Sequence, residues 1–233
     1  MSGRPNRVWD YETEKTVMGR FGLKANKGSV RLQTAAAFHS DVGISNEIFP
    51  DQPCTKRQAA CLQQPDGRDK EGTELSKDQL LTVVNFTKSL AVPKRREATD
   101  ETVLAGRRFF HQIGCANCHH PSYRTKKSTE FPHLSEQTIW PYSDLLLHDM
   151  GPKLADGRPD YLANGSEWRT PPLWGIGLSK KVNGAQNFLH DGRARTVEEA
   201  ILWHGGEAEA AMQAFSRLSR EERSSLIKFV NSL

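Results

Sequence analysis

Two of the four cysteines in the chain are separated by only two residues, and a histidine follows directly after the second. The stretch is Gly-Cys-Ala-Asn-Cys-His-His-Pro, in which Cys115, Cys118 and His119 form the pattern Cys-x-x-Cys-His. This pattern is typical of covalent haem attachment, because each thiol can form a thioether with one vinyl group. The histidine that follows can supply a nitrogen ligand to the iron. The motif predicts one c-type haem per chain, with His120 exposed beside it.

A zinc site is the alternative for these two thiols, because Cys-x-x-Cys also suits tetrahedral zinc. Zinc would require two further ligands at a comparable spacing. The other cysteines, Cys54 and Cys61, are too far apart in sequence for that pattern. The sequence therefore favours haem, and a non-catalytic metal-binding domain remains as an alternative.

One histidine leaves the sixth position of the iron to another side chain. Five downstream residues have a suitable chemistry: His148, Met150, His190, His204 and Met212. His204 ends a short predicted helix before Gly205-Gly206, which would let it project into a site. A histidine at a helix end can instead interact with the helix dipole alone. Residue types do not decide between the candidates.

Six helices are expected around this motif. Helix caps and the spacing of apolar residues indicate three before it and three near the C-terminus. Gly114 breaks the third helix directly before Cys115. Thr196 with Glu199 and Ser219 with Glu222 are the caps expected near the C-terminus. The expected helices are residues 30–38, Ser76 to before Pro93, Thr99 or Asp100 to Ile113, Val197–His204, Glu207–Leu218, and the segment after Ser219.

Residues 50–75 and 120–184 are rich in proline, glycine and charge and have little periodicity, so they are expected to be loops. Loops this long are unusual unless they have a function, and irregular chain can wrap a haem. No segment alternates convincingly enough to predict a strand. The expected fold class is mostly α, a haem-dependent domain with long loops.

Composition agrees with a cofactor-dependent core. The hydrophobic fraction is 36% and the mean hydropathy is −0.63, which is lean for a globular chain. The net charge is +4, with short basic runs at 93–97 and 124–127. These runs favour solvated loops over nucleic-acid binding, and an acidic redox partner is a weaker reading. No segment approaches the ~20 apolar residues of a membrane span.

The N-terminus is inconsistent with the haem motif. Residues 1–15 lack the apolar core of a signal peptide, whereas covalent haem attachment normally takes place outside the cytoplasm. We therefore expect a periplasmic or otherwise exported protein whose natural N-terminus is missing from this sequence. In an oxidising compartment Cys54 and Cys61 would form a disulfide, and two buried free thiols are the alternative.

Several stretches in this order resemble the C-terminal haem domain of bacterial di-haem cytochrome c peroxidase relatives, in particular the di-haem oxidoreductases also described as thiol oxidoreductases. The stretches are GCANCHHP, YSDLLLHDMG, EWRTPPLWGIG, FLHDGRARTVEEAILWH and GGEAEAAMQAF. GRFGLKA and AAAFHSDVGIS resemble the region before that domain. The resemblance implies an incomplete helical N-terminal region over 1–92 and a cytochrome c-like domain over 93–233.

The resemblance also implies roles for individual residues. The family's distal iron ligand, which is Met or Tyr in many relatives, falls on His204, so a bis-histidine iron is expected, with Met150 as the alternative to His204. By the same analogy Arg169 pairs with a haem propionate and Trp174 packs near the ring. Their alternatives are a surface arginine and a core tryptophan. Relatives often bind calcium through carbonyls near residues 185–187.

One departure from the family is prominent. The family has two Cys-x-x-Cys-His motifs, and this chain has one. The chain therefore resembles the electron-transfer half of a two-centre oxidoreductase, which accepts and relays electrons with a redox partner or a second haem domain. A complete peroxidase or oxidase that acts with a second haem, upstream or on another chain, is the alternative.

Overall fold

The computed structural model describes residues 3–70 and 72–233. These residues form two compact units, each with its own core. The N-terminal unit is Asn6–Ala91, and the C-terminal unit is Val92–Leu233 together with the described part of Met1–Pro5.

The N-terminal unit begins with an antiparallel hairpin of β1 (Arg7–Asp10) and β2 (Lys15–Met18), in which Val8 lies opposite Val17. Helix α1 (Val30–Ala37) starts at Ser29, whose hydroxyl accepts a hydrogen bond from the Leu32 amide. It continues as a π-helical turn over Phe38–Val42, which ends at Gly43 in the left-handed conformation.

Helix α3 (Lys77–Ser89) completes this unit. Its N-terminus has the expected capping box between Ser76 and Gln79. The helix packs on α1 through a small core of Ala35, Leu80 and Val84. The short helix α2 (Ala59–Leu62) carries Cys61, which forms a disulfide with Cys54 across Cα atoms 5.9 Å apart.

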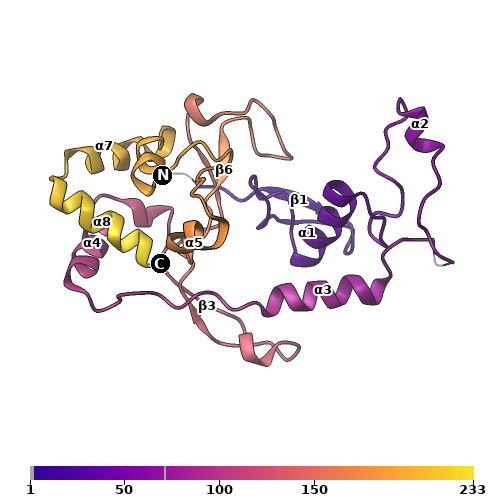
Figure 1. The fold of residues 1–233 in the computed structure, drawn as a ribbon, viewed down its shortest axis with the longest axis horizontal. Helices are drawn as coiled ribbons and strands as arrows, with labels where there is room; N and C mark the ends of the chain where they lie inside the picture. The colour runs from indigo at the N-terminus through magenta and orange to yellow at the C-terminus, as the bar shows by residue number, and fades with distance from the viewer. Residues whose placement is uncertain (1–2, 71) are drawn as a thin grey trace. The chain divides into compact units, whose positions relative to one another are not determined.

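Helices α4 (Glu101–Gln112) and α8 (Arg220–Ser232) pack side by side in the C-terminal unit (Figure 1). Gly106 allows their close approach, because a Cβ atom there would lie 1.9 Å from the carbonyl oxygen of Ser225. Phe110 and Phe229 meet edge-to-face with ring centroids 5.3 Å apart. The core beneath the motif therefore depends on this helix pair.

The remaining elements of the C-terminal unit are short. Three further helices are α5 (Ser179–Asn183), α6 (Val197–Leu202) and α7 (Glu209–Arg217). Single 3₁₀ turns cover Cys115–Asn117, Pro132–Leu134, Pro152–Leu154, Ile176–Leu178 and Gly206–Ala208.

Two predicted helices begin or end at other residues in the structure. Helix α6 ends at Leu202, so His204 lies just beyond it. The segment predicted as Glu207–Leu218 begins as a 3₁₀ turn and becomes α-helical at Glu209. Both differences occur at Gly205-Gly206, where the backbone changes direction and the local pattern is weakest.

The prediction that the chain has no strands was wrong. Besides the first hairpin, β3 (Tyr123–Arg124) pairs with β4 (Thr138–Ile139), and β5 (Leu147–Asp149) pairs with β6 (Glu167–Arg169). Strands of two to four residues are too short to show an alternating pattern, and outside the first hairpin each strand pairs with a segment more than ten residues away.

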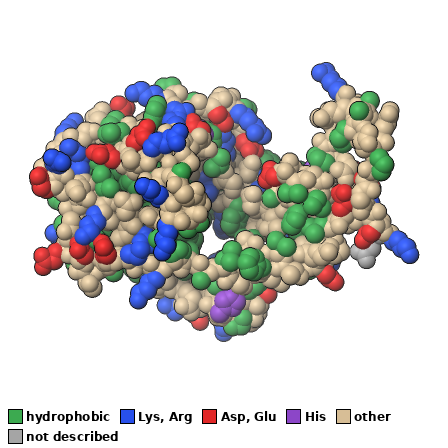
Figure 2. Space-filling model, in the orientation of Figure 1, with side chains coloured by type: hydrophobic (Ala, Val, Ile, Leu, Met, Phe, Trp, Pro, Cys, Tyr) green, Lys and Arg blue, Asp and Glu red, His purple; other side chains and the backbone are tan. Residues whose placement is uncertain are grey.

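None of the helices in residues 3–70 and 72–233 is long and apolar enough to cross a membrane. On the face of the C-terminal unit visible in Figure 2, lysine and arginine side chains are interspersed with aspartate and glutamate.

Candidate haem site

The haem motif lies directly after α4. Gly114 has a φ of 91°, a left-handed conformation that ends the helix and starts the 3₁₀ turn carrying Cys115. Cys115 and Cys118 are both half-buried, and neither takes part in a disulfide. Burial raises the pKa of the Cys115 thiol to about 12. The two thiols are therefore placed side by side on one rigid turn.

His119 is held with a defined ring orientation. Its Nδ1 lies 2.9 Å from the carbonyl oxygen of Tyr142, so Nδ1–H donates to the backbone. The lone pair is then on Nε2, as a metal ligand requires. Burial lowers the pKa of His119 to about 4, with a further contribution from the charge of His204. His119 is consequently neutral at pH 7.

His204 has the same kind of anchor. Its Nδ1 lies 2.7 Å from the carbonyl oxygen of Ala200, and burial lowers its pKa. The segments that carry the two histidines pack on the same core, because Cys115 of the motif and Trp203, directly before His204, both contact one cluster of buried residues. Among the described residues, neither Nε2 has a hydrogen-bond partner.

These donors fit a covalently attached haem. Two thiols on one turn suit the vinyl groups, and two neutral imidazoles with anchored Nδ1–H atoms suit the two axial positions. A zinc site fits less well, because in residues 3–70 and 72–233 no three His, Cys, Asp or Glu side chains converge as a metal site.

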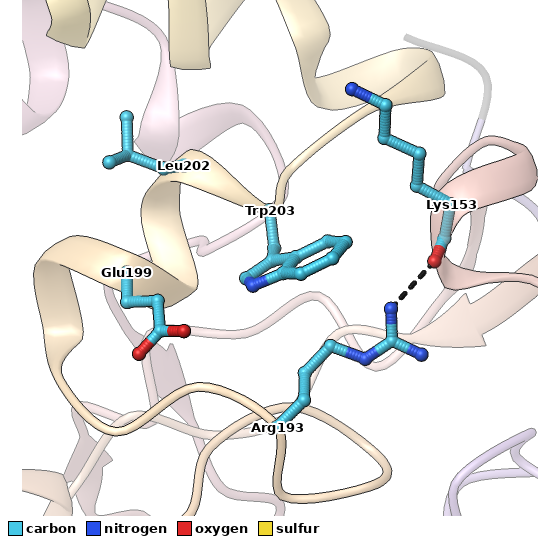
Figure 3. Close-up of a pocket in the computed structure, with 5 residues that line it drawn as sticks. All are labelled: Lys153, Arg193, Glu199, Leu202 and Trp203. Carbon is cyan, nitrogen blue, oxygen red and sulfur yellow. Dashed lines mark hydrogen bonds between the residues drawn. The ribbon is translucent and has the colours of Figure 1, made fainter.

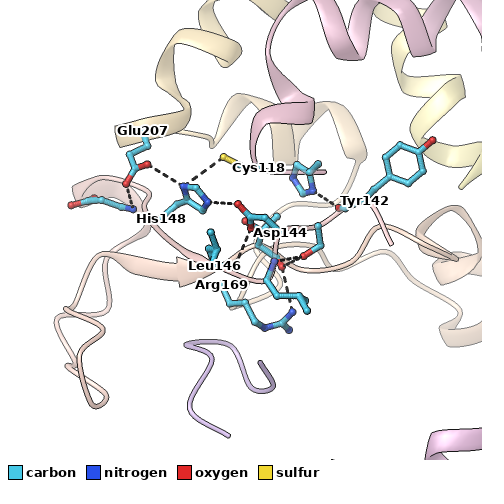
Figure 4. A network of polar contacts seen from close by, with 12 residues as sticks. Cys118, Tyr142, Asp144, Leu146, His148, Arg169 and Glu207 are labelled. Carbon is cyan, nitrogen blue, oxygen red and sulfur yellow. Dashed lines mark hydrogen bonds and ion pairs between the residues drawn. The ribbon is translucent and has the colours of Figure 1, made fainter. Parts of the chain in front are cut away.

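A buried histidine, His148, forms a polar network beside the motif, which the sequence did not predict. His148 is only 3% exposed and lies between two carboxylates (Figure 4). Its Nε2 is 2.8 Å from Asp144 Oδ2, and its Nδ1 is 3.0 Å from Glu207 Oε2 and 3.6 Å from Cys118 Sγ. Since both ring nitrogens are engaged, His148 is unsuited to be the sixth iron ligand.

The other predicted haem contacts lie in the same unit. Arg169 is half-buried at the end of β6, where its Nη1 lies 3.3 Å from the Thr170 carbonyl oxygen and burial lowers its pKa. Trp174 is half-buried after core residue Leu173. The backbone of Met150 packs against the turn after His204, since a Cβ on Gly205 would lie 3.0 Å from the Met150 carbonyl oxygen.

The other candidates by residue type have different surroundings. The His190 ring stacks on Trp168 with centroids 3.7 Å apart. Met212 lies in α7, and His120 is exposed with its ring 4.8 Å from that of Tyr123. Residues 185–187 form irregular chain after α5, and the calcium site there stays a prediction.

A pocket of about 580 Å³ lies beside the residue before His204 (Figure 3). Its lining residues are Lys153, Arg193, Glu199, Leu202 and Trp203. The Arg193 guanidinium lies 4.6 Å from the centroid of the Trp203 ring, and its Nη1 donates to the Lys153 carbonyl oxygen at 2.7 Å. Arg193 therefore links Trp203, the residue before His204, to the segment that contains Lys153.

Sequence reasoning missed Asp144 and Glu207. The signal for Asp144 is visible in hindsight, because Asp144 and His148 are four residues apart in YSDLLLHDMG. Glu207 has no such signal, since it is 59 residues from His148 and meets it only through folding.

Comparisons with known proteins give the family of the chain. A family model described as "Di-haem oxidoreductase, putative peroxidase" matches residues 1–233. No curated protein matches the chain. Among solved structures, a chain of Kuenenia stuttgartiensis hydrazine synthase is similar, with 18% sequence identity and a TM-score of 0.44. That match covers 69% of this chain, and this chain spans 57% of the hydrazine synthase chain.

Proposed function

Because the chain belongs to the di-haem oxidoreductase family, we propose that it is a c-type haem electron-transfer unit of such an oxidoreductase. Cys115 and Cys118 would attach the haem, and His119 and His204 would hold its iron from opposite sides. The domain over 93–233 would have a cytochrome c-like fold, and the protein would work in an exported compartment with a redox partner or a second haem domain.

The observation that carries this proposal is the matched pair of histidines. Each is half-buried with a pKa lowered by burial, and each donates Nδ1–H to a backbone carbonyl, at 2.9 Å for His119 and 2.7 Å for His204. Neutral imidazole with its other nitrogen anchored is the form that ligates iron. A histidine with only a structural role can form hydrogen bonds with both ring nitrogens. His119 and His204 each form one at Nδ1 only, which leaves Nε2 for a ligand.

When bound, the haem supplies a one-electron change at iron, and the protein residues set its environment. The two histidines would leave no position for a substrate, which favours electron relay over substrate chemistry at this centre. Tyr142 and Ala200 keep both rings in the ligating tautomer. The Phe110 ring lies beside the His119 ring, with centroids 6.2 Å apart.

A complete peroxidase or oxidase is the second candidate, and the family description favours it. It requires a second haem, upstream or on another chain. The haem-to-protein ratio of the native protein separates the two candidates, because one haem per protomer supports the relay unit and two support the complete enzyme.

The test of the proposal uses protein made with the haem-attachment machinery. The denatured chain should have the mass of the polypeptide plus one haem. His204→Ala should convert low-spin iron to high-spin and allow carbon monoxide to bind the ferrous form. Met150→Ala is the matched control and should do neither. Bare polypeptide with zinc, or a His204→Ala protein that stays low-spin, would contradict the proposal.

A further inference from the structure

We propose that His148 is a positioning residue that joins the segment carrying His204 to the segment carrying His119. This inference rests on the proposed function, because it concerns how the two iron ligands are held relative to each other. The joint consists of His148, Asp144 and Glu207, and we call it the His148 bridge.

The first half of the bridge leads to the haem motif. Asp144 accepts a hydrogen bond from His148 at 2.8 Å, and its own amide donates to the Cys118 carbonyl oxygen at 2.9 Å. The Ser143 amide donates to the His120 carbonyl oxygen at 2.9 Å. Two residues earlier than Asp144, the Tyr142 carbonyl anchors His119. The residues 142–144 thus follow the motif backbone closely, and Asp144 links them to His148.

The second half leads to His204. Glu207 lies three residues after His204, and its Oε1 accepts a hydrogen bond from the Asp149 amide at 3.2 Å while Oε2 contacts His148. Gly206 is pressed against the same strand, since a Cβ there would lie 2.3 Å from the Asp149 carbonyl oxygen. The turn after His204 is therefore fastened to the strand that carries His148.

The bridge needs a histidine that donates from both ring nitrogens. Only the imidazolium has two N–H groups, and each of them faces a carboxylate here. Burial alone would lower the pKa of His148, but the hydrogen bonds to Asp144 and Glu207 act in the opposite direction and favour the charged ring. The ring is also enclosed, because a Cβ on Gly3 would lie 2.4 Å from it. A water molecule would therefore have little room to replace the ring between the two carboxylates.

The inference predicts a specific spectroscopic effect. In the full-length protein with haem attached, His148→Gln and Glu207→Gln should each loosen the His204 segment. Both variants should show more high-spin ferric iron and should bind carbon monoxide in the ferrous form about tenfold faster or more, the range typical of residues that orient metal ligands. Lys228→Gln, which breaks an ion pair with Asp100 at 2.9 Å elsewhere in the unit, is the control and should leave both readouts unchanged.

His204→Ala is measured alongside so that two failures can be told apart. If His204→Ala leaves the iron low-spin, the proposed function fails. If His204→Ala is high-spin but His148→Gln and Glu207→Gln keep the wild-type spectrum and binding rate, the bridge is refuted, even if their melting temperatures fall. Should His148→Gln not fold, Glu207→Gln alone decides, because it cuts only the His204 side.

Discussion

At the scale of single residues, the site depends on which ring nitrogen of each histidine carries the proton. Backbone carbonyls decide this for His119 and His204, whereas two carboxylates decide it for His148. Burial lowers the pKa of the first two, which favours the neutral form that can ligate iron, whereas the carboxylates raise the pKa of the third and engage both of its nitrogens. Three histidines of the same unit thus acquire two different chemistries from their hydrogen-bond partners.

The identity of the sixth ligand leads to a redox prediction. His204→Met should keep six-coordinate, low-spin iron and raise the reduction potential, because thioether ligation favours the ferrous state more than imidazole does. Redox titration followed by absorbance measures the shift. Met150→Leu should leave the potential unchanged. If Met150→Leu turns the iron high-spin while His204→Met changes nothing, Met150 is the ligand.

At the scale of elements, the helix pair beneath the motif depends on one glycine. Gly106→Ala would place a Cβ 1.9 Å from the Ser225 carbonyl oxygen and 2.8 Å from the Phe229 Cβ, so α4 and α8 must separate. The higher helix propensity of alanine offsets this by only about 1 kcal/mol.

We expect Gly106→Ala to lower the free energy of unfolding by about 1–3 kcal/mol, the usual cost of overpacking. Denaturant unfolding of the haem-containing protein measures it. Arg108→Ala, at an exposed position of the same helix, is the control and should stay within about 0.5 kcal/mol of wild type. Equal unfolding midpoints for both variants would show that the helices adjust freely.

In the N-terminal unit a single carboxylate holds several loops together. Glu74 accepts hydrogen bonds from the Ser45 amide and hydroxyl, from Gln52 and from the Gly67 amide at 2.8–3.1 Å. The bond from the Ser45 amide contributes most, and together the bonds lower the pKa of Glu74 to about 2. Loops distant in sequence therefore depend on the charge of one side chain.

Glu74→Gln should weaken this unit by about 1–3 kcal/mol at pH 7, because an amide leaves donors unsatisfied. A lowered pKa stabilises the fold above the unfolded value of about 4.5, and this contribution is lost as the pH falls toward 2. The difference between Glu74→Gln and wild type should therefore shrink over that range.

Hydrogen exchange on peptides of Asn6–Ala91 can follow this loss. Asp41→Asn, at an exposed position of the same unit, should show little change at any pH. A Glu74→Gln difference that is constant between pH 7 and pH 3 would argue against the charge-dependent account.

At the scale of the whole molecule, the four cysteines divide between two tasks. Cys54 and Cys61 form a disulfide in the N-terminal unit, whereas Cys115 and Cys118 are the two cysteines that would attach the haem. The unfolded protein with haem attached should therefore contain no reactive thiol before reduction and two after it. Thiol counting by mass spectrometry checks this. Two reactive thiols in unreduced protein from an oxidising compartment would contradict the pairing.

Local sequence patterns were sufficient for the longer helices, but not for α2 and α5, which lie in stretches expected to be loops. Caps such as Ser76 with Gln79 and Ser219 with Glu222 act within three residues, and the structure contains both boxes. The Thr196 box forms only in part, since Glu199 bonds the Arg195 amide in place of the Thr196 amide. The fixed spacing of Cys115, Cys118 and His119 likewise needs no information from the fold.

Contacts between distant segments could be decided only by the tertiary structure. The segments that carry His119 and His204 pack on one core although the two residues are 85 positions apart in sequence, and Glu207 meets His148 across 59 positions. The paired strands of two and three residues also depend on distant partners. The physical reason is that a local pattern indicates only which face of a segment is buried. Which other segment contacts that face depends on how the whole unit packs.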